Sequence, residues 1–84
     1  MRVKLLGYLG YVAGKEVIEV GNVKDIKDVL DRLSTLKGMD VLLYNGDMLW
    51  EGILLILNGK VVGKDTEVVK EDDELVITLP TAGG

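Results

Sequence analysis

The feature that most constrains the fold of this chain is a single segment of helical periodicity with strand-like segments on both sides of it. Asn22 is a favourable N-cap, and Asp25 stands three residues further on, in the position of a capping-box acid. Apolar residues then recur at helical spacing at Val23, Ile26, Val29, Leu30 and Leu33. This pattern predicts one amphipathic helix that begins at Asn22 and ends near Gly38. One helix between strands predicts an α+β domain with the helix packed on one face of a sheet.

Two strand-like segments precede the helix. Apolar residues alternate from Arg2 to Val12, where Gly7 and Gly10 are typical of bulges or of close backbone approach. Alternation resumes from residue 16 to 20 after a turn. The two segments are therefore expected to pair as a hairpin.

Four more strands are expected after the helix. They cover residues 41–44, 53–57, 60–62 and 74–79. Asn45–Gly46 and Asn58–Gly59 are typical of tight hairpin turns, and the second is the stronger signal because it lies between two apolar runs. The charged segment 70–73 is expected to be a solvated turn, and Pro80 to end the last strand.

Composition narrows the possible functions. A chain of 84 residues predicts one domain, residues 1–84, and an apolar content of 48% predicts that it folds. The sequence contains no cysteine and no histidine, so we expect no catalytic residue of the usual kinds and no metal site. The net charge of −4, without a basic cluster, argues against a nucleic-acid partner. No apolar run is long enough to span a membrane and no signal peptide is recognised, so we expect a cytoplasmic protein with no membrane partner.

The last five residues, 80–84, differ in character from the domain before them. They end in Gly83–Gly84, and two residues without a Cβ make a thin thread that can enter a narrow channel. One interpretation is that residues 80–84 form a flexible tail that presents the Gly84 carboxylate to another protein, but the tail residues alone favour a simpler one. The simpler interpretation is a frayed terminus.

Several segments, taken in order, resemble the β-grasp (ubiquitin-like) sulfur carriers of the MoaD/ThiS type, and most closely the small subunit of molybdopterin synthase. The segments are 3–8 with Gly14 for the first strand, Asn22–Val23 with Ile26 and Leu30 for the helix, 57–62 for a hairpin, and 73–77 with Pro80 and Gly83–Gly84 for the last strand and tail. The resemblance implies a ubiquitin-like β-grasp fold, with a mixed sheet of four to five strands and one main helix on one face.

The resemblance also implies a function without catalysis by this chain. A ubiquitin-activating-like enzyme would use ATP to adenylate the Gly84 carboxylate, and a sulfur donor would convert it to a thiocarboxylate. This chain would then be a carrier, or the non-catalytic small subunit of a synthase, with no stably bound cofactor. The large subunit of molybdopterin synthase would accept the sulfur for molybdenum cofactor biosynthesis.

Such a carrier needs a surface for its partners, and the alternation of the strands predicts one. Val3, Leu5, Ile18, Leu55, Leu57, Leu75 and Ile77 are expected to face the helix. The outer face then carries a set of residues that we call the docking patch, because apolar surface on a small domain usually marks an interaction site. The docking patch consists of Leu6, Tyr8, Leu54, Ile56, Val76 and Thr78.

Two other functions remain open. Leu6, Thr78 and Leu79 depart from the residues common in the molybdopterin synthase subunit, where aromatic residues or proline are frequent. The sequence is also similar to archaeal and eukaryotic relatives in which the same carboxylate is conjugated to lysines of target proteins or supplies sulfur for tRNA thiolation. A β-grasp interaction module with an inert Gly-Gly is the third possibility.

Overall fold

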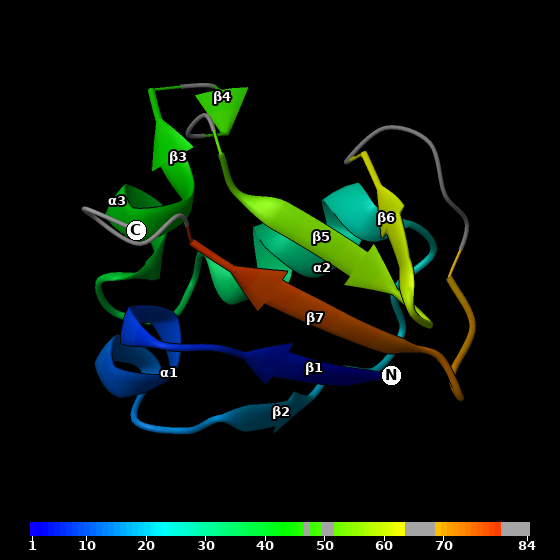
Figure 1. The fold of residues 1–84 in the computed structure, drawn as a ribbon. Coiled ribbons are helices and arrows are strands. Elements are labelled where there is room, and N and C mark those ends of the chain that lie inside the picture. The colour runs from blue at the N-terminus through cyan, green and yellow to red at the C-terminus, as the bar shows by residue number, and fades with distance from the viewer. Residues whose placement is uncertain (47, 50–51, 64–68, 80–84) are drawn as a thin grey trace.

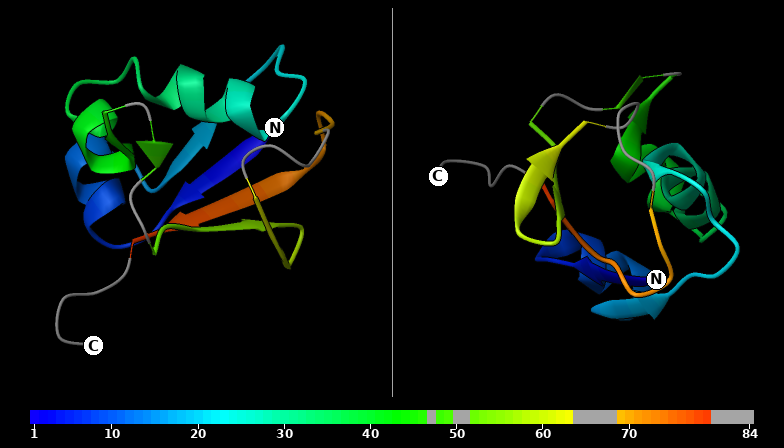
Figure 2. Two further views of the ribbon diagram at one scale, coloured as in Figure 1. Left: turned by 90° about the horizontal axis from the view of Figure 1, so that it is seen from above. Right: turned by 90° about the vertical axis from the view of Figure 1, so that its right-hand side faces the viewer.

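A computed structural model describes residues 1–46, 48–49, 52–63 and 69–79 of the chain. They form two layers, a five-stranded sheet and a layer of helices on one of its faces (Figure 1 and Figure 2). The sheet contains β1 (Arg2–Leu5), β2 (Val17–Glu19), β5 (Leu54–Leu57), β6 (Lys60–Val62) and β7 (Glu74–Thr78). The helices are α1 (Tyr8–Ala13), α2 (Ile26–Leu33) and α3 (Met39–Leu43). This confirms the α+β, ubiquitin-like β-grasp class with one main helix.

The order of the strands in the sheet is β2-β1-β7-β5-β6. The first and last strands, β1 and β7, are parallel neighbours, whereas the other three pairs are antiparallel. The sheet is therefore mixed, as expected. β7 lies at its centre, with a partner on each side along its length.

The core lies between the helices and one face of the sheet. Alternate residues of β1, β5 and β7 point toward it, and α2 contributes four buried side chains. The buried sheet residues are Val3, Leu5, Leu55, Leu57, Leu75 and Ile77, and Ile18 packs against them partly buried. The predicted inner face is confirmed at all seven positions. Burial of these aliphatic side chains is the main source of stability in a domain of this size.

The first expected strand is wrong beyond Leu5. Residues Tyr8–Ala13 form a helix that begins after Gly7, whose φ of 62° turns the chain out of the sheet, and ends at Gly14, which is left-handed with φ 77°. Leu9 is fully buried, and Gly10 packs so closely under β1 that a Cβ there would lie 2.7 Å from the Leu5 carbonyl oxygen. The short apolar run fits a helix as well as a strand, so periodicity alone could not distinguish them. The expected pairing of the two flanking strands is correct, but α1 connects them.

The main helix begins three residues later than predicted, because its N-cap is Asp25 and not Asn22, and it ends earlier, at Leu33 instead of near Gly38. Asn22 is left-handed with φ 60°, whereas Asp25 is extended and its side chain accepts a hydrogen bond of 2.8 Å from the Asp28 N–H. Asp28 in turn accepts one of 3.0 Å from the Lys24 N–H. The two aspartates together cap the first turn of the helix. At the other end, the Ser34 hydroxyl donates to the Leu30 carbonyl at 2.9 Å, and α2 ends at Leu33.

The segment expected as a strand at 41–44 is mostly helical. Residues Met39–Leu43 form α3, which follows the left-handed Gly38 and buries Met39 and Leu43. Tyr44 then begins a small second sheet of β3 (Tyr44–Asn45) and β4 (Met48–Leu49). These two strands pair antiparallel, with Asn45 opposite Met48, so the chain reverses here as expected, but Asn45 is the last residue of a strand and not part of the turn.

The hairpin predicted at Asn58–Gly59 is confirmed and is tied to the central strand. Both residues are left-handed, with φ 50° and 86°, as a two-residue hairpin turn requires. The Asn58 side chain accepts a hydrogen bond of 2.9 Å from the Glu74 N–H and donates one of 2.9 Å to Asp73. The Asp73 carboxylate also accepts from the Lys70 N–H at 2.8 Å, within the predicted charged turn. This arrangement links the β5–β6 turn to the start of β7.

Candidate docking surface and tail exit

The central strand leads directly to the tail. β7 ends at Thr78, and Leu79 packs partly buried against the core. The residues predicted to carry the chemistry, Gly83 and Gly84, lie outside the described residues, as does the rest of the 80–84 segment. Figure 1 shows the end of β7 on the same side of the molecule as α1 and α3. The candidate site is therefore the surface around this end of the sheet.

Four residues of the docking patch lie together on the outer face of the sheet. Leu54 is the direct partner of Thr78, and Ile56 is the direct partner of Val76, in the β5–β7 register. Directly opposed residues point to the same side of a sheet, and their neighbours in sequence are buried on the inner side. Leu54 is 45% exposed and the other three are half-buried. This part of the patch forms a small apolar surface that begins at the tail exit.

Leu6 extends the patch across to β1. Its N–H donates a hydrogen bond of 3.0 Å to the Ile77 carbonyl, which continues the β1–β7 ladder one residue beyond β1. Its side chain is 47% exposed. Leu6 and Thr78 therefore lie on neighbouring segments of the sheet, at the end where β7 terminates.

Tyr8 is not on the sheet, which corrects the expectation that it lies on the outer face of a strand. It is the first residue of α1, and its side chain is 60% exposed. Sequence reasoning missed Tyr11, which is 78% exposed and whose ring stacks on that of Tyr8 with 5.9 Å between centroids and an interplanar angle of 23°. The available signal was their spacing of three residues, which places two side chains together only if the segment is helical.

Charged side chains lie next to the docking patch, toward the end of β1 and β7 that is far from the tail. Lys4 is the register partner of Val76 and forms an ion pair of 3.6 Å with Glu74, and Arg2 forms one of 3.2 Å with Glu19. These exposed pairs contribute little to stability. Exposed apolar side chains continue beyond the tail end of this face, because Val61, which is 62% exposed, lies opposite Ile56, and Val17, which is 43% exposed, lies opposite Lys4.

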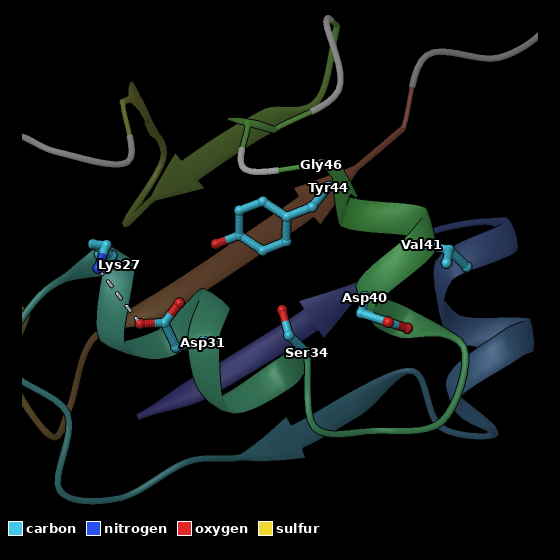
Figure 3. Close-up of a pocket in the computed structure, with 7 residues that line it drawn as sticks. All are labelled: Lys27, Asp31, Ser34, Asp40, Val41, Tyr44 and Gly46. Atoms are coloured by element: carbon cyan, nitrogen blue, oxygen red, sulfur yellow. Dashed lines mark ion pairs between the residues drawn. The ribbon is translucent and has the colours of Figure 1, made fainter.

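A pocket lies elsewhere, on the helical layer (Figure 3). It has a volume of about 480 Å³ and is lined by Lys27, Asp31, Ser34, Asp40, Val41, Tyr44 and Gly46. Burial, together with the negative charge of Asp31, raises the pKa of Tyr44, so its hydroxyl stays protonated at neutral pH. Lys27 and Asp31 form an exposed ion pair at 3.8 Å. Of the predicted site residues that the structure describes, none lines this pocket.

The outer face offers apolar surface that a partner can bury. The docking-patch side chains on the sheet are aliphatic except for Thr78, and burying the aliphatic ones against a partner is favourable by about 25 cal/mol per Å². Within the part of the chain that the structure describes, no three acidic side chains gather as a group that could hold a metal ion. Over the same residues, the helices are too short or too polar to cross a bilayer.

Comparison with known proteins identifies the family. The ThiS family model matches residues 3–84, nearly the whole chain. A search of curated protein sequences found no match.

Solved structures share the fold over almost their full length. Small archaeal modifier protein 1 from Haloferax volcanii is 27% identical, with 100% of this chain and 98% of that chain covered and a TM-score of 0.85. Its namesake from Methanosarcina acetivorans is 26% identical, with 99% and 94% covered and a TM-score of 0.84. A chain of the Amycolatopsis orientalis BexX/CysO complex has 23% identity, 99% and 98% coverage and a TM-score of 0.82, and shows the fold alone. The chain therefore belongs to the ThiS family, among the ubiquitin-like sulfur carriers and modifiers.

Proposed function

We propose that this chain is a sulfur carrier whose C-terminal Gly84 carboxylate is adenylated by an ATP-dependent activating enzyme and then converted to a thiocarboxylate. The observation that carries the proposal is the family match, which extends through the terminal Gly83–Gly84. The position of Leu79, from which the tail begins, also supports the proposal. The strand before the tail is the central one of the sheet, and it ends beside exposed apolar residues that a partner can bury.

The chemistry requires only the carboxylate from this chain. A Gly84 carboxylate oxygen attacks the α-phosphorus of ATP and displaces pyrophosphate, which leaves a mixed anhydride with AMP. A hydrosulfide-level sulfur donor then attacks the carbonyl carbon, so that a C–S bond forms and the C–O bond to AMP breaks. The products are AMP and a terminal thiocarboxylate, whose sulfur can be passed on. The activating enzyme supplies the ATP site, which is why this carrier is proposed to need no cofactor of its own.

For the acceptor, we propose first the large subunit of molybdopterin synthase. The support is the resemblance of the strand and hairpin segments to the small subunit of that enzyme. In this role the chain is a non-catalytic subunit, and the docking patch of Leu6, Leu54, Ile56, Val76 and Thr78, with Tyr8 beside it, meets the large subunit while the tail reaches its active site.

A second role is conjugation of the Gly84 carboxylate to lysines of other proteins. The observation that favours it is the likeness, at 26–27% identity and nearly full coverage, to two structures named as small archaeal modifier protein 1. Both roles share the adenylation step and differ in the nucleophile that displaces AMP, which is sulfur in one and a lysine amine in the other. Delivery of sulfur to tRNA is a further use of the same thiocarboxylate.

Intact mass spectrometry of the untagged chain tests the proposal. The chain is incubated with ATP, sulfide and an extract of the organism from which it comes. A mass gain equal to the exchange of one oxygen for one sulfur, located at Gly84 by fragmentation, supports the carrier role. Isopeptide linkage of Gly84 to lysines supports the modifier role. The control is the chain without Gly83 and Gly84, and the proposal fails if the full chain yields neither product or if the control yields either one.

A further inference from the structure

The stacked Tyr8–Tyr11 pair is an exposed aromatic surface on a rigid support. The α1 helix that carries it contains no charged residue, and its other side is anchored by the fully buried Leu9 and by Gly10, which packs against the backbone of β1. The two rings already contact each other. A partner that buries them therefore loses little side-chain entropy, and tyrosine is one of the residues enriched among those that dominate binding energy.

The length of the tail limits where a partner can bind. Five residues follow Leu79, and a fully extended chain spans at most about 3.5 Å per residue, so Gly84 reaches no more than about 17 Å from Leu79. An enzyme that takes the Gly84 carboxylate into its active site must therefore cover the end of the sheet at which β7 terminates. Interfaces of stable complexes bury roughly 800 Å² on each partner, which is more than the tail alone can supply.

The Tyr8–Tyr11 pair lies within this limited region. The Leu6 N–H bonds to the Ile77 carbonyl at 3.0 Å, and Tyr8 and Leu79 each lie two residues beyond these partners. With 3.8 Å between consecutive Cα atoms, the Cα atoms of Tyr8 and Leu79 are within roughly 20 Å of each other. Figure 1 shows α1 at the same end of the sheet as the end of β7. The pair is therefore placed where an enzyme at the tail can make contact.

We propose that the stacked Tyr8–Tyr11 pair is a recognition element for the enzyme that adenylates Gly84. The inference rests on the proposed function. We assign the activating enzyme as the partner because adenylation comes first in both the carrier and the modifier roles. The activating enzyme therefore binds this surface whichever acceptor follows. The sheet face stays available to contribute the remainder of the interface.

The test is pyrophosphate–ATP exchange that depends on this chain, measured with the activating fraction of the source organism. Initial rates are followed as a function of the concentration of the chain for the wild type, the Tyr8→Ala/Tyr11→Ala double variant and the Tyr8→Phe/Tyr11→Phe double variant. We expect the alanine variant to raise the KM for the chain by about tenfold or more, as for loss of dominant interface residues. The kcat at saturation should stay close to that of the wild type, and the phenylalanine variant should recover most of the affinity because the stacked rings remain.

A matched control separates recognition from general loss of exposed apolar surface. Met48 is 71% exposed, similar to Tyr11, but lies on β4 at the far side of α3 from α1 (Figure 1). Met48→Ala should leave the KM unchanged, and circular dichroism of each variant shows whether the fold is retained.

Each outcome of the exchange assay decides one claim. An alanine variant that is folded and has the wild-type KM overturns the inference, and so does an unchanged KM combined with a later defect in transfer to the acceptor. Exchange that persists without Gly83–Gly84, or that the wild-type chain fails to stimulate, overturns the proposed function and this inference with it.

Discussion

Replacement of Gly10 by alanine is the sharpest test of the packing that holds α1 in place. A Cβ at this position would lie 2.7 Å from the Leu5 carbonyl oxygen and 3.5 Å from Glu16 Cγ. The nearer atom belongs to the backbone of β1, so it cannot move aside as the end of a side chain would. Relief requires a shift of α1 or of β1, whose Leu5 N–H also donates to the Glu16 carbonyl at 2.8 Å.

Two opposing effects set the size of the change. Alanine is favoured over glycine in a helix by about 1 kcal/mol. Overpacking of a close contact costs about 1–3 kcal/mol, and contact with rigid backbone places this case near the upper limit. We therefore expect Gly10→Ala to lower the free energy of unfolding by about 2 kcal/mol, against the direction that helix propensity alone predicts.

Urea unfolding followed by circular dichroism measures the change through the midpoint and the slope. The control is Gly21→Ala, because a Cβ at Gly21 meets nothing within 4 Å and should change the free energy of unfolding by no more than about 0.5 kcal/mol. If Gly10→Ala proves as stable as the wild type, or more stable, the close approach of α1 to β1 is wrong.

Three further predictions concern the Asn58 turn and the outer face. Asn58→Ala should lower the free energy of unfolding by about 2 kcal/mol, because two hydrogen bonds are lost at a position with left-handed backbone. Asn58→Gly should lower it by only about 1 kcal/mol, because glycine adopts this backbone conformation without strain. Urea titration of both variants tests this. The hydrogen bonds from Asn58 and from the Lys70 N–H hold the pKa of Asp73 below its ordinary value of 3.8. The charged Asp73 therefore stabilises the fold above pH 3.8, and this stabilisation is lost as the pH falls through the lower pKa of the folded state. Asp73→Asn should therefore lose stability at neutral pH and converge with the wild type in acid, and parallel curves in a pH series of thermal unfolding would contradict this. Leu54→Asp should stay folded, because the side chain is exposed, but should slow formation of the thiocarboxylate at least tenfold, since an unpaired charge would be buried against the partner; an unchanged rate in the mass-spectrometric assay would remove Leu54 from the docking patch.

The parts of the fold that sequence patterns predicted are those where one physical signal dominates. The alternation of β7 and β5 fixed which residues face the core, and Asn58–Gly59 fixed a hairpin because few other residue pairs adopt two left-handed conformations in succession. The Asn22 helix start was wrong because the sequence offers several capping residues within a few positions, and only packing decides among them.

The candidate site was predicted in its sheet portion and missed in its helical portion. Leu54, Ile56, Val76 and Thr78 follow from strand alternation. Tyr11 was missed because the segment after Gly7 was assigned to a strand, which puts Tyr8 and Tyr11 on opposite faces. The decisive facts, the positive φ of Gly7 and the contact of Gly10 with β1, depend on tertiary structure that the local pattern does not contain.

The central position of β7 has a mechanical consequence for the proposed role, in which a partner acts on the tail. A partner that pulls on residues beyond Leu79 applies force along β7, which is hydrogen-bonded on one side to the parallel β1 and on the other to the antiparallel β5. Force in this direction loads both ladders in shear, so their hydrogen bonds share the load instead of breaking one after another. The domain should therefore resist extraction through its C-terminus, and its tail can be drawn taut into an active site while the sheet stays intact.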